Sequence, residues 1–206
     1  MRTLVIASQK GGVGKTTIAG HLASMAESQG DGPVALIDTD PQGSLSSWWN
    51  ERKIETPVFA SVDIDSLPAH LLQLEKSGVM LAIIDTPPAV TETIRKVLVV
   101  ADLVLIPTRP SPHDLRAVGS TVGLVEAAGK RMVFVINGAA QRAKITGEAA
   151  IALSQHGTVA PITLYQRTDF AASMIDGRTA QEIDPASRSA NEVAELWKYV
   201  HTQLHK

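Results

Sequence analysis

The sequence predicts an α/β protein with a mostly parallel β-sheet that has helices on both of its faces. Short aliphatic and β-branched runs recur along the 206 residues, and they are apolar throughout instead of alternating with polar residues. Such runs are typical of strands that are buried on both faces. Segments with helical patterns separate them, and a strand–helix–strand order implies right-handed crossovers between parallel strands.

The runs define the expected elements in order. The first run leads directly into a glycine-rich segment, and the third follows Pro57. The expected strands are Thr3–Ala7, Val34–Ile37, Val58–Val62, Val79–Ile84, Leu103–Ile106, Met132–Ile136 and Val159–Leu164. The expected helices are Lys15–Gln29, Ser66–Ser77, Val90–Val100, Asp114–Ala128, Gly147–His156 and Ser187–Leu204. His113 and His156 lack the paired spacing of a metal site, so we assign them to a helix start and a helix end.

The last expected helix, Ser187–Leu204, is amphipathic. Its apolar residues recur at helical spacing, and other positions on the helical wheel hold Asn191, Glu192, Glu195 and Lys198. We expect this helix to dock on the body of the protein. A membrane-surface anchor is the alternative, and the mixed charge argues against it because such anchors favour a basic polar face.

Composition narrows the class of protein. With 44% hydrophobic and 4% aromatic residues, the chain fits an aliphatic-rich globular protein, and its length favours a single domain over 1–206. It has no cysteine, which excludes disulfides, zinc–thiolate sites, iron–sulfur clusters and thiol nucleophiles. No apolar run approaches the ~18 residues of a membrane span, and Met1 leaves no room for a signal peptide before the first strand. We therefore expect a cytoplasmic protein, and the net charge of -2 does not by itself indicate a nucleic-acid binder.

A glycine-rich segment, SQKGGVGKTTIAG over 8–20, connects the first strand to the first helix. It is a variant of the phosphate-binding pattern G-x-x-x-x-G-K-[ST], because Gln9 stands where that pattern has its first glycine. Glycines allow backbone N–H groups to face phosphate oxygens, Lys15 neutralises phosphate charge, and Thr16 would supply a hydroxyl ligand to magnesium. The nucleotide-binding residues expected here are Gly11, Gly12, Val13, Gly14, Lys15, Thr16 and Thr17. The sequence thus predicts a P-loop nucleoside triphosphatase fold.

Two further strand ends bear carboxylates. One expected strand runs into Asp38-Thr-Asp40, and another runs into Asp85-Thr-Pro-Pro. Because the carboxyl ends of parallel strands meet at one edge of a sheet, these side chains are expected near the glycine-rich loop. Magnesium prefers oxygen ligands and keeps several waters, so carboxylates at this edge fit a magnesium–phosphate site.

Three motifs together resemble the ParA/MinD family of deviant Walker ATPases. They are Lys10-Gly-Gly-Val-Gly-Lys-Thr-Thr, Asp38-Thr-Asp-Pro-Gln-Gly and Ile84-Asp-Thr-Pro-Pro, and the whole chain can be laid along that family. Val135-Ile-Asn is similar to the family's strand end beside the adenine. Ser8, just before the glycine-rich loop, departs from the asparagine that the family often has at that position. Asp-Pro-Gln and the short length are similar to small ParA forms without an amino-terminal DNA-reading domain. The resemblance implies ATP and Mg²⁺ as cofactors and a Mg²⁺-dependent ATPase with weak intrinsic activity.

The resemblance also implies roles for single residues. Lys15 and Thr16 would bind phosphate and magnesium, and Asp85 would hold magnesium through water. Asp40 would position or activate the attacking water, and Asp38 would support magnesium or the same water network. A further residue, at the end of the strand beside the adenine, would contact the base; this is Asn137.

Lys10 is a second lysine, at the mouth of the glycine-rich loop. The resemblance implies that it crosses a dimer interface to the partner's nucleotide, so that two subunits enclose two ATP molecules. A cation supplied by the neighbouring subunit would make hydrolysis depend on dimerisation, as an arginine finger does in GTPases. The alternative is a lysine that is merely solvated.

The family uses this switch to segregate DNA, to position other cargo on the nucleoid and to pattern membranes. We expect a partition ATPase for a plasmid or chromosome: an ATP-bound homodimer binds non-specific DNA, away from membranes, and a ParB-like or other centromere-binding partner stimulates hydrolysis and releases it. The alternatives are an orphan ATPase that positions a protein cargo, a MinD-like membrane-cycling regulator, and a small-molecule kinase or ligase. Candidate DNA contacts are Arg142, Lys144, Arg167, Arg178 and Arg188. Trp48 and Trp49 fit a packing anchor or partner-docking surface better than base stacking.

Overall fold

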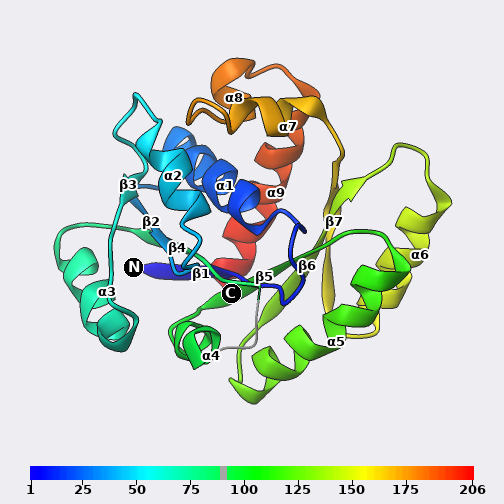
Figure 1. The fold of residues 1–206 in the computed structure, drawn as a ribbon, viewed down its shortest axis with the longest axis horizontal. Coiled ribbons are helices and arrows are strands. Elements are labelled where there is room, and N and C mark those ends of the chain that lie inside the picture. The colour runs from blue at the N-terminus through cyan, green and yellow to red at the C-terminus, as the bar shows by residue number, and fades with distance from the viewer. Residues whose placement is uncertain (89–91) are drawn as a thin grey trace.

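The computed structural model describes residues 1–88 and 92–206. Within these residues, one sheet of seven strands has the order β3-β2-β4-β1-β5-β6-β7 (Figure 1). The strands are β1 Arg2–Ile6, β2 Val34–Asp38, β3 Val58–Phe59, β4 Leu81–Asp85, β5 Leu103–Thr108, β6 Met132–Ala139 and β7 Thr158–Tyr165. All neighbouring strands run parallel. The predicted parallel α/β fold is confirmed.

Helices cover both faces of the sheet. They are α1 Lys15–Gln29, α2 Ser44–Asn50, α3 Leu67–Lys76, α4 Glu92–Val99, α5 Pro112–Ala127, α6 Lys144–Ser154, α7 Thr168–Ser173, α8 Ala180–Ile183 and α9 Arg188–Leu204. One face packs against α1, α2 and α9, and the other packs against α3, α4, α5 and α6. Successive strand residues point to opposite faces, so Leu4 and Ile6 join the first core while Val5 and Ala7 join the second.

Helix α9 docks on the first face of the sheet, as predicted. Ser187 accepts a hydrogen bond from the Ala190 N–H and so caps the start of the helix. The apolar residues that were expected to face the protein are all buried: Val193, Leu196, Trp197, Val200 and Leu204. The Trp197 indole also donates to Asp31 at 2.7 Å. The apolar face of this helix is therefore part of the core.

Several predicted boundaries are wrong. Strand β4 begins at Leu81 and not at Val79, because the Val79 N–H donates to the Leu74 carbonyl and closes the end of α3. Strand β3 stops at Phe59 instead of Val62, since it pairs only with β2 at the sheet edge. Strand β6 continues past Ile136 to Ala139, pairing irregularly with β7. Helix α6 begins at Lys144 and not at Gly147, and it ends at Ser154.

Most other boundaries shift by one or two residues. His113 lies in the first turn of α5 and His156 follows the last turn of α6, as expected. The helix expected over Val90–Val100 is described as α4 from Glu92 onward, and its expected start at Val90 lies outside the described residues. Helices α2, α7 and α8 were not predicted.

Candidate functional site

The predicted site residues lie at one edge of the sheet. Strands β2, β4 and β1 are neighbours, and their last residues pair in register, Ile6 with Asp85 and Asp38 with Asp85. The loops that follow these strands therefore begin side by side. The glycine-rich segment follows β1, Asp38 and Asp85 are the last residues of β2 and β4, and Asp40 lies in the loop after β2.

The glycine-rich loop depends on glycine at two positions. Gly12 and Gly14 have φ values of 73° and 90°, in the left-handed region that side chains disfavour. A Cβ at Gly14 would also overlap the side-chain nitrogen of Asn137. Gly14 precedes α1 without a side-chain cap, so the first N–H groups of the helix are free to meet a ligand. Together these features form a cradle for an anion.

Lys15 is the buried cation of the site. Its residue is 7% exposed, at the start of α1. Burial lowers the pKa of Lys15, while the nearby carboxylates of Asp85 and Asp40 raise it without a hydrogen bond. An ammonium group whose solvation is reduced is well suited to a phosphate oxygen.

Asp85 and Thr16, two of the residues predicted to hold magnesium, are in direct contact. The Thr16 hydroxyl donates to Asp85 at 2.6 Å, and Asp85 is 1% exposed. The pKa of Asp85 is raised to about 7, chiefly by burial and also by the nearby Asp38, although the Thr16 hydrogen bond and Lys15 lower it. A bound cation would favour the charged carboxylate that burial opposes.

Asp38 holds the neighbouring loop in place. One of its oxygens accepts from the Asp40 N–H at 3.0 Å, and the other accepts from the Leu45 and Ser46 N–H groups, also at 3.0 Å. The carboxylate thus caps α2 from outside the helix. Asp40 is partly exposed, lines the cavity described below and accepts from the Gln42 N–H at 3.0 Å. Asp38 therefore stabilises the loop and the start of α2, a structural role that is separate from its predicted role toward magnesium or water. Asp40 faces the cavity.

A cavity of about 930 Å³ lies against the loop. Gly11, Gly12, Gly14, Lys15, Thr16, Thr17 and Asn137 line it. The Asn137 amide donates to the Val13 carbonyl at 2.6 Å, which joins the end of β6 to the glycine-rich loop. The far wall of the cavity was not predicted from the sequence; it comprises Leu164, Tyr165, Gln166, Arg167, Phe170, Ala171 and Met174. These residues lie at the end of β7 and just after it, at the same edge of the sheet, and this position is the signal that could have found them.

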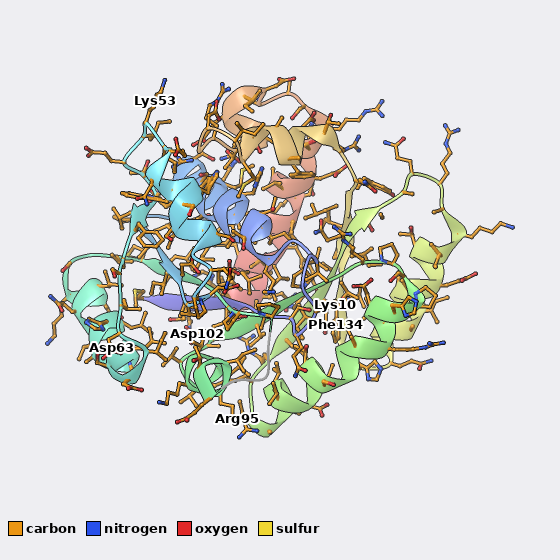
Figure 2. The ribbon with its side chains drawn as sticks, in the orientation of Figure 1. Lys10, Lys53, Asp63, Arg95, Asp102 and Phe134 are labelled. Atoms are coloured by element: carbon orange, nitrogen blue, oxygen red, sulfur yellow. The ribbon has the colours of Figure 1, made fainter. Side chains whose placement is uncertain are left out.

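Lys10 is separate from this cavity. It is exposed and does not line the cavity wall, and its backbone N–H donates to the Ser8 hydroxyl at 3.3 Å (Figure 2). Among the described residues, its ammonium group has no ion pair. Lys10 thus has no partner within its own subunit in this part of the chain.

The candidate DNA contacts divide into two groups. Arg167 pairs with Glu192 and Arg178 pairs with Asp176 at 2.7 Å, so both guanidinium groups already have carboxylate partners. The others are exposed and form no ion pair with any described residue; they are Arg142, Lys144 and Arg188.

The residues fit a nucleotide with Mg²⁺. Among the described residues, no group of three or more His, Cys, Asp or Glu side chains could hold a metal ion by itself. Mg²⁺ bound beside phosphates needs only one or two protein ligands, because phosphate oxygens and water complete its octahedron. Thr16 and Asp85 could supply those ligands, and the glycine cradle with Lys15 could hold the phosphates. This fold and site define a P-loop nucleotide-binding protein.

The family is shown by sequence. The model of the CobQ/CobB/MinD/ParA nucleotide binding domain matches residues 4–184, so the chain belongs to that family of P-loop ATPases. The resemblance to ParA/MinD proteins is thereby confirmed.

The chain is also similar to individual proteins with known names or structures. The chain is 28% identical to the Maintenance of carboxysome distribution protein A of Halothiobacillus neapolitanus, over 91% of this chain and 90% of that protein. It is also 28% identical to the Chromosome-partitioning ATPase Soj of Thermus thermophilus, over 61% and 62% of the two chains. The solved structure of Cyanthece apo McdA covers 98% of this chain and 99% of its own at a TM-score of 0.80 and 19% identity, which shows a shared fold.

Proposed function

We propose that the protein is a Mg²⁺-dependent ATPase that works as a dimeric switch on DNA. One observation supports this most directly. Lys15 and Thr16, whose hydroxyl is hydrogen-bonded to the buried Asp85, border a cavity large enough for a nucleotide, whereas Lys10 from the same loop is exposed and unpaired within the described part of the chain. The phosphate-binding groups of one subunit do not require Lys10. An exposed lysine of this kind fits a site that is completed by residues of a second subunit.

The proposed chemistry is hydrolysis of the terminal phosphate by water. Lys15 and the loop N–H groups hold the phosphates, and Asp40, which borders the cavity, orients the attacking water. Mg²⁺, held by Thr16 and Asp85, would neutralise charge on the phosphates when bound. Lys10 of the partner subunit would stabilise the transition state, which keeps a lone subunit slow.

The ATP-bound dimer is proposed to bind DNA without sequence preference. Arg142, Lys144 and Arg188 are the strongest candidates because no described carboxylate pairs with them. Contacts of this kind reach phosphate oxygens, so binding should weaken as salt rises. A partner protein on the cargo would stimulate hydrolysis and release the dimer. In the first candidate the cargo is a plasmid or chromosome with a ParB-like or other centromere-binding partner, and the ATPase is cytoplasmic and nucleoid-associated.

A protein cargo is the second candidate. The similarity to a carboxysome distribution protein over 91% of the chain favours it. A bacterial host would discriminate between the two. Deleting the gene should cause loss of a plasmid or chromosome under the first candidate, and mislocalised protein particles with normal DNA inheritance under the second.

A membrane-cycling function has less support. No helix among the described residues is long and apolar enough to cross a membrane. The apolar face of α9, the one candidate for a surface anchor in the sequence, is buried in the core. Co-sedimentation of the protein with anionic liposomes in ATP is expected to stay at background.

Co-sedimentation with DNA in ATP, ADP or no nucleotide tests the switch. The wild type should bind DNA only with ATP. Lys15→Ala should lose nucleotide and DNA binding, and Asp40→Ala should bind DNA but not hydrolyse ATP. Lys10→Ala should lose hydrolysis and dimerise more weakly. Equal DNA retention by all four proteins, whatever the nucleotide, would contradict the switch.

A further inference from the structure

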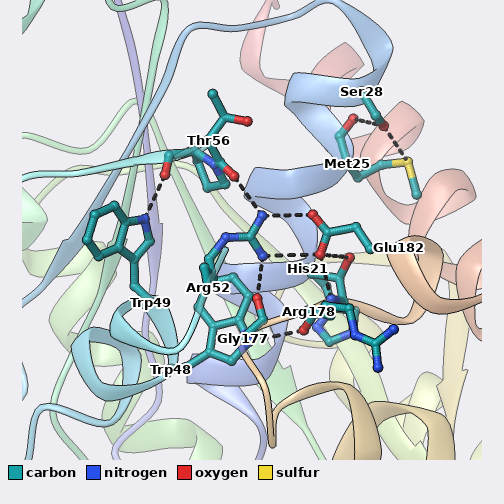
Figure 3. Close-up of polar contacts among 12 residues, drawn as sticks. His21, Met25, Ser28, Trp48, Trp49, Arg52, Thr56, Gly177, Arg178 and Glu182 are labelled. Atoms are coloured by element: carbon teal, nitrogen blue, oxygen red, sulfur yellow. Dashed lines mark hydrogen bonds and ion pairs between the residues drawn. The ribbon is translucent and has the colours of Figure 1, made fainter. Parts of the chain in front are cut away.

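A buried ion pair lies outside the nucleotide cavity, between the end of α2 and the start of α8. Arg52 follows α2 by two residues, and its side chain is 2% exposed. It faces Glu182 of α8, whose side chain is 18% exposed (Figure 3). Guanidinium nitrogens meet the two carboxylate oxygens at 2.7 Å and 3.1 Å. A pair this buried and bidentate differs from the solvated ion pairs of a protein surface.

The same guanidinium also binds two backbone carbonyls. One terminal nitrogen donates to Gly177 at 2.5 Å and the other donates to Thr56 at 2.6 Å. The group stacks over the Trp48 ring, 4.8 Å from its centroid. Arg52 thus joins three segments of the chain at once: the end of α2, the loop before β3, and the α7–α8 connection. Lysine could not reproduce this fork of donors.

The α7–α8 connection is held closely at this point. A Cβ on Gly177 would overlap the backbone of Arg52, so only glycine allows this approach. The Trp48 indole donates to the Arg178 carbonyl at 3.1 Å. On the other side, the Ala180 N–H donates to His21 of α1 at 3.1 Å. The ion pair therefore lies where α1, α2 and the α7–α8 connection meet.

Helix α2 links this junction to the nucleotide site. It has seven residues, about 10 Å of rigid helix. At its start, Asp38 accepts from the Leu45 and Ser46 N–H groups, and the Gly43 N–H donates to the Asp40 carbonyl at 2.9 Å. A shift at the Arg52 end must therefore move the segment that holds Asp40. Phe170 and Met174, just before the same α7–α8 connection, form part of the cavity's far wall.

We propose that Arg52 and Glu182 are positioning residues for ATP hydrolysis: their ion pair fixes α2, and through it the Asp40 loop, relative to the phosphate loop on α1. This inference rests on the proposed ATPase function. Neither residue lines the cavity, so neither acts on the nucleotide directly. Their pair sets the distance between the group that orients water and the groups that hold phosphate.

Two conservative variants test the proposal in the full-length chain. Arg52→Lys keeps the charge and removes the fork, and Glu182→Gln keeps an oxygen for the Thr179 N–H and removes the charge. Both should lower kcat for ATP by about tenfold, because small misplacement of reacting groups is costly, while KM and the Kd for ADP stay within about twofold. Hydrogen exchange at Gly43, Leu45 and Ser46 should become faster in both, with β1 and β4 unchanged.

A core variant separates positioning from stability. Leu204→Ala in α9 removes a buried side chain far along the sequence from α2, and it should lower Tm without changing kcat or exchange in α2 below the transition. Wild-type kcat and wild-type exchange in both Arg52→Lys and Glu182→Gln would overturn the proposal, as would the same changes in Leu204→Ala at matched stability. If the wild type hydrolyses no ATP, the proposed function fails by itself, and hydrogen exchange still decides whether the pair fixes the Asp40 loop.

Discussion

His21 illustrates how a single buried side chain is committed to one protonation state. Its Nδ1 lies 2.8 Å from the Thr17 carbonyl, and its Nε2 lies 3.1 Å from the Ala180 N–H. A backbone N–H can only donate, so Nε2 accepts and the proton is on Nδ1. Burial lowers the pKa of His21 to about 4. The ring is therefore neutral in the folded protein at neutral pH.

The neutral, buried His21 is expected to make a destabilising contribution as the pH is lowered into mild acid. The unfolded chain takes up a proton near pH 6.5, whereas the folded chain takes it up only near pH 4. Between these values the unfolded state binds more protons. The contribution of His21 to the free energy of unfolding should therefore fall by about 1.4 kcal/mol for each unit by which the pH is lowered. Urea unfolding at pH 7, 6 and 5 measures it. Asp85 contributes with the opposite sign over the same range, because its raised pKa makes the folded state bind the extra proton, so the test is the difference between the two proteins. From pH 7 to pH 5, His21→Gln should lose less stability than the wild type, and equal changes would contradict the assignment.

Gly14 is the second residue whose environment gives a sharp expectation. Gly14→Ala should abolish nucleotide binding, because the left-handed φ of 90° and the overlap with Asn137 both oppose a side chain. Gly147→Ala is the matched control, since a Cβ there meets nothing within 4 Å inside helix α6. The control should bind nucleotide normally and unfold at the same or a slightly higher temperature. Titration with a fluorescent ATP analogue compares the two variants. Normal binding by Gly14→Ala would contradict the claim that the glycine-rich loop holds the phosphates.

At the scale of elements, α9 gives a test of the docked-helix interpretation. Leu196 is 0% exposed, while its neighbour Glu195 is exposed. Leu196→Ala should lower the free energy of unfolding by about 2–5 kcal/mol, and Glu195→Ala should change it by less than about 0.5 kcal/mol. Denaturant unfolding measures both. Similar small effects in the two variants would mean that α9 is not packed as described.

Elements with strong local patterns could be predicted from the sequence, and those fixed by distant contacts could not. Helix α1 was placed at its observed bounds because glycine, lysine and threonine mark its start. Helix α2 was missed because its cap is Asp38, outside the helix and six residues before Ser44. Helix α8 has only four residues, too few for a helical period; the Thr179–Glu182 capping box marks its start locally, and Arg52 contacts it from far away in sequence. The local sequences of α2 and α8 do not indicate their contacts with Asp38 and Arg52.

The same reasoning applies to the site. The phosphate loop and Asp85 could be predicted because a local motif and strand-end carboxylates identify them. The hydrogen bonds from Asp38 to the start of α2 could not be predicted, because they depend on how the chain turns after Asp40. The far wall from Leu164 to Met174 has no motif, and its contribution follows only from the place of β7 in the sheet.

At the scale of the whole molecule, the central proposal is that one site needs two subunits. The fold brings Lys15, Thr16, Asp40 and Asp85 together at the carboxyl ends of three adjacent strands, β1, β2 and β4. Lys10 is exposed beside them. If Lys10 acts on the partner's nucleotide, then a subunit that lacks Lys10 can still hydrolyse ATP when its partner has one.

Mixing Lys10→Ala with Asp40→Ala tests this directly. Each variant alone should hydrolyse almost no ATP. In an equal mixture, half of the dimers pair the two variants, and in each of these the Lys10→Ala subunit keeps its own Asp40 and receives Lys10 from its partner. We predict recovery of up to about a quarter of wild-type turnover, one working site in half of the dimers. Turnover no greater than the sum of the separate variants, with mixed dimers demonstrated by cross-linking, would contradict a lysine that acts across the interface.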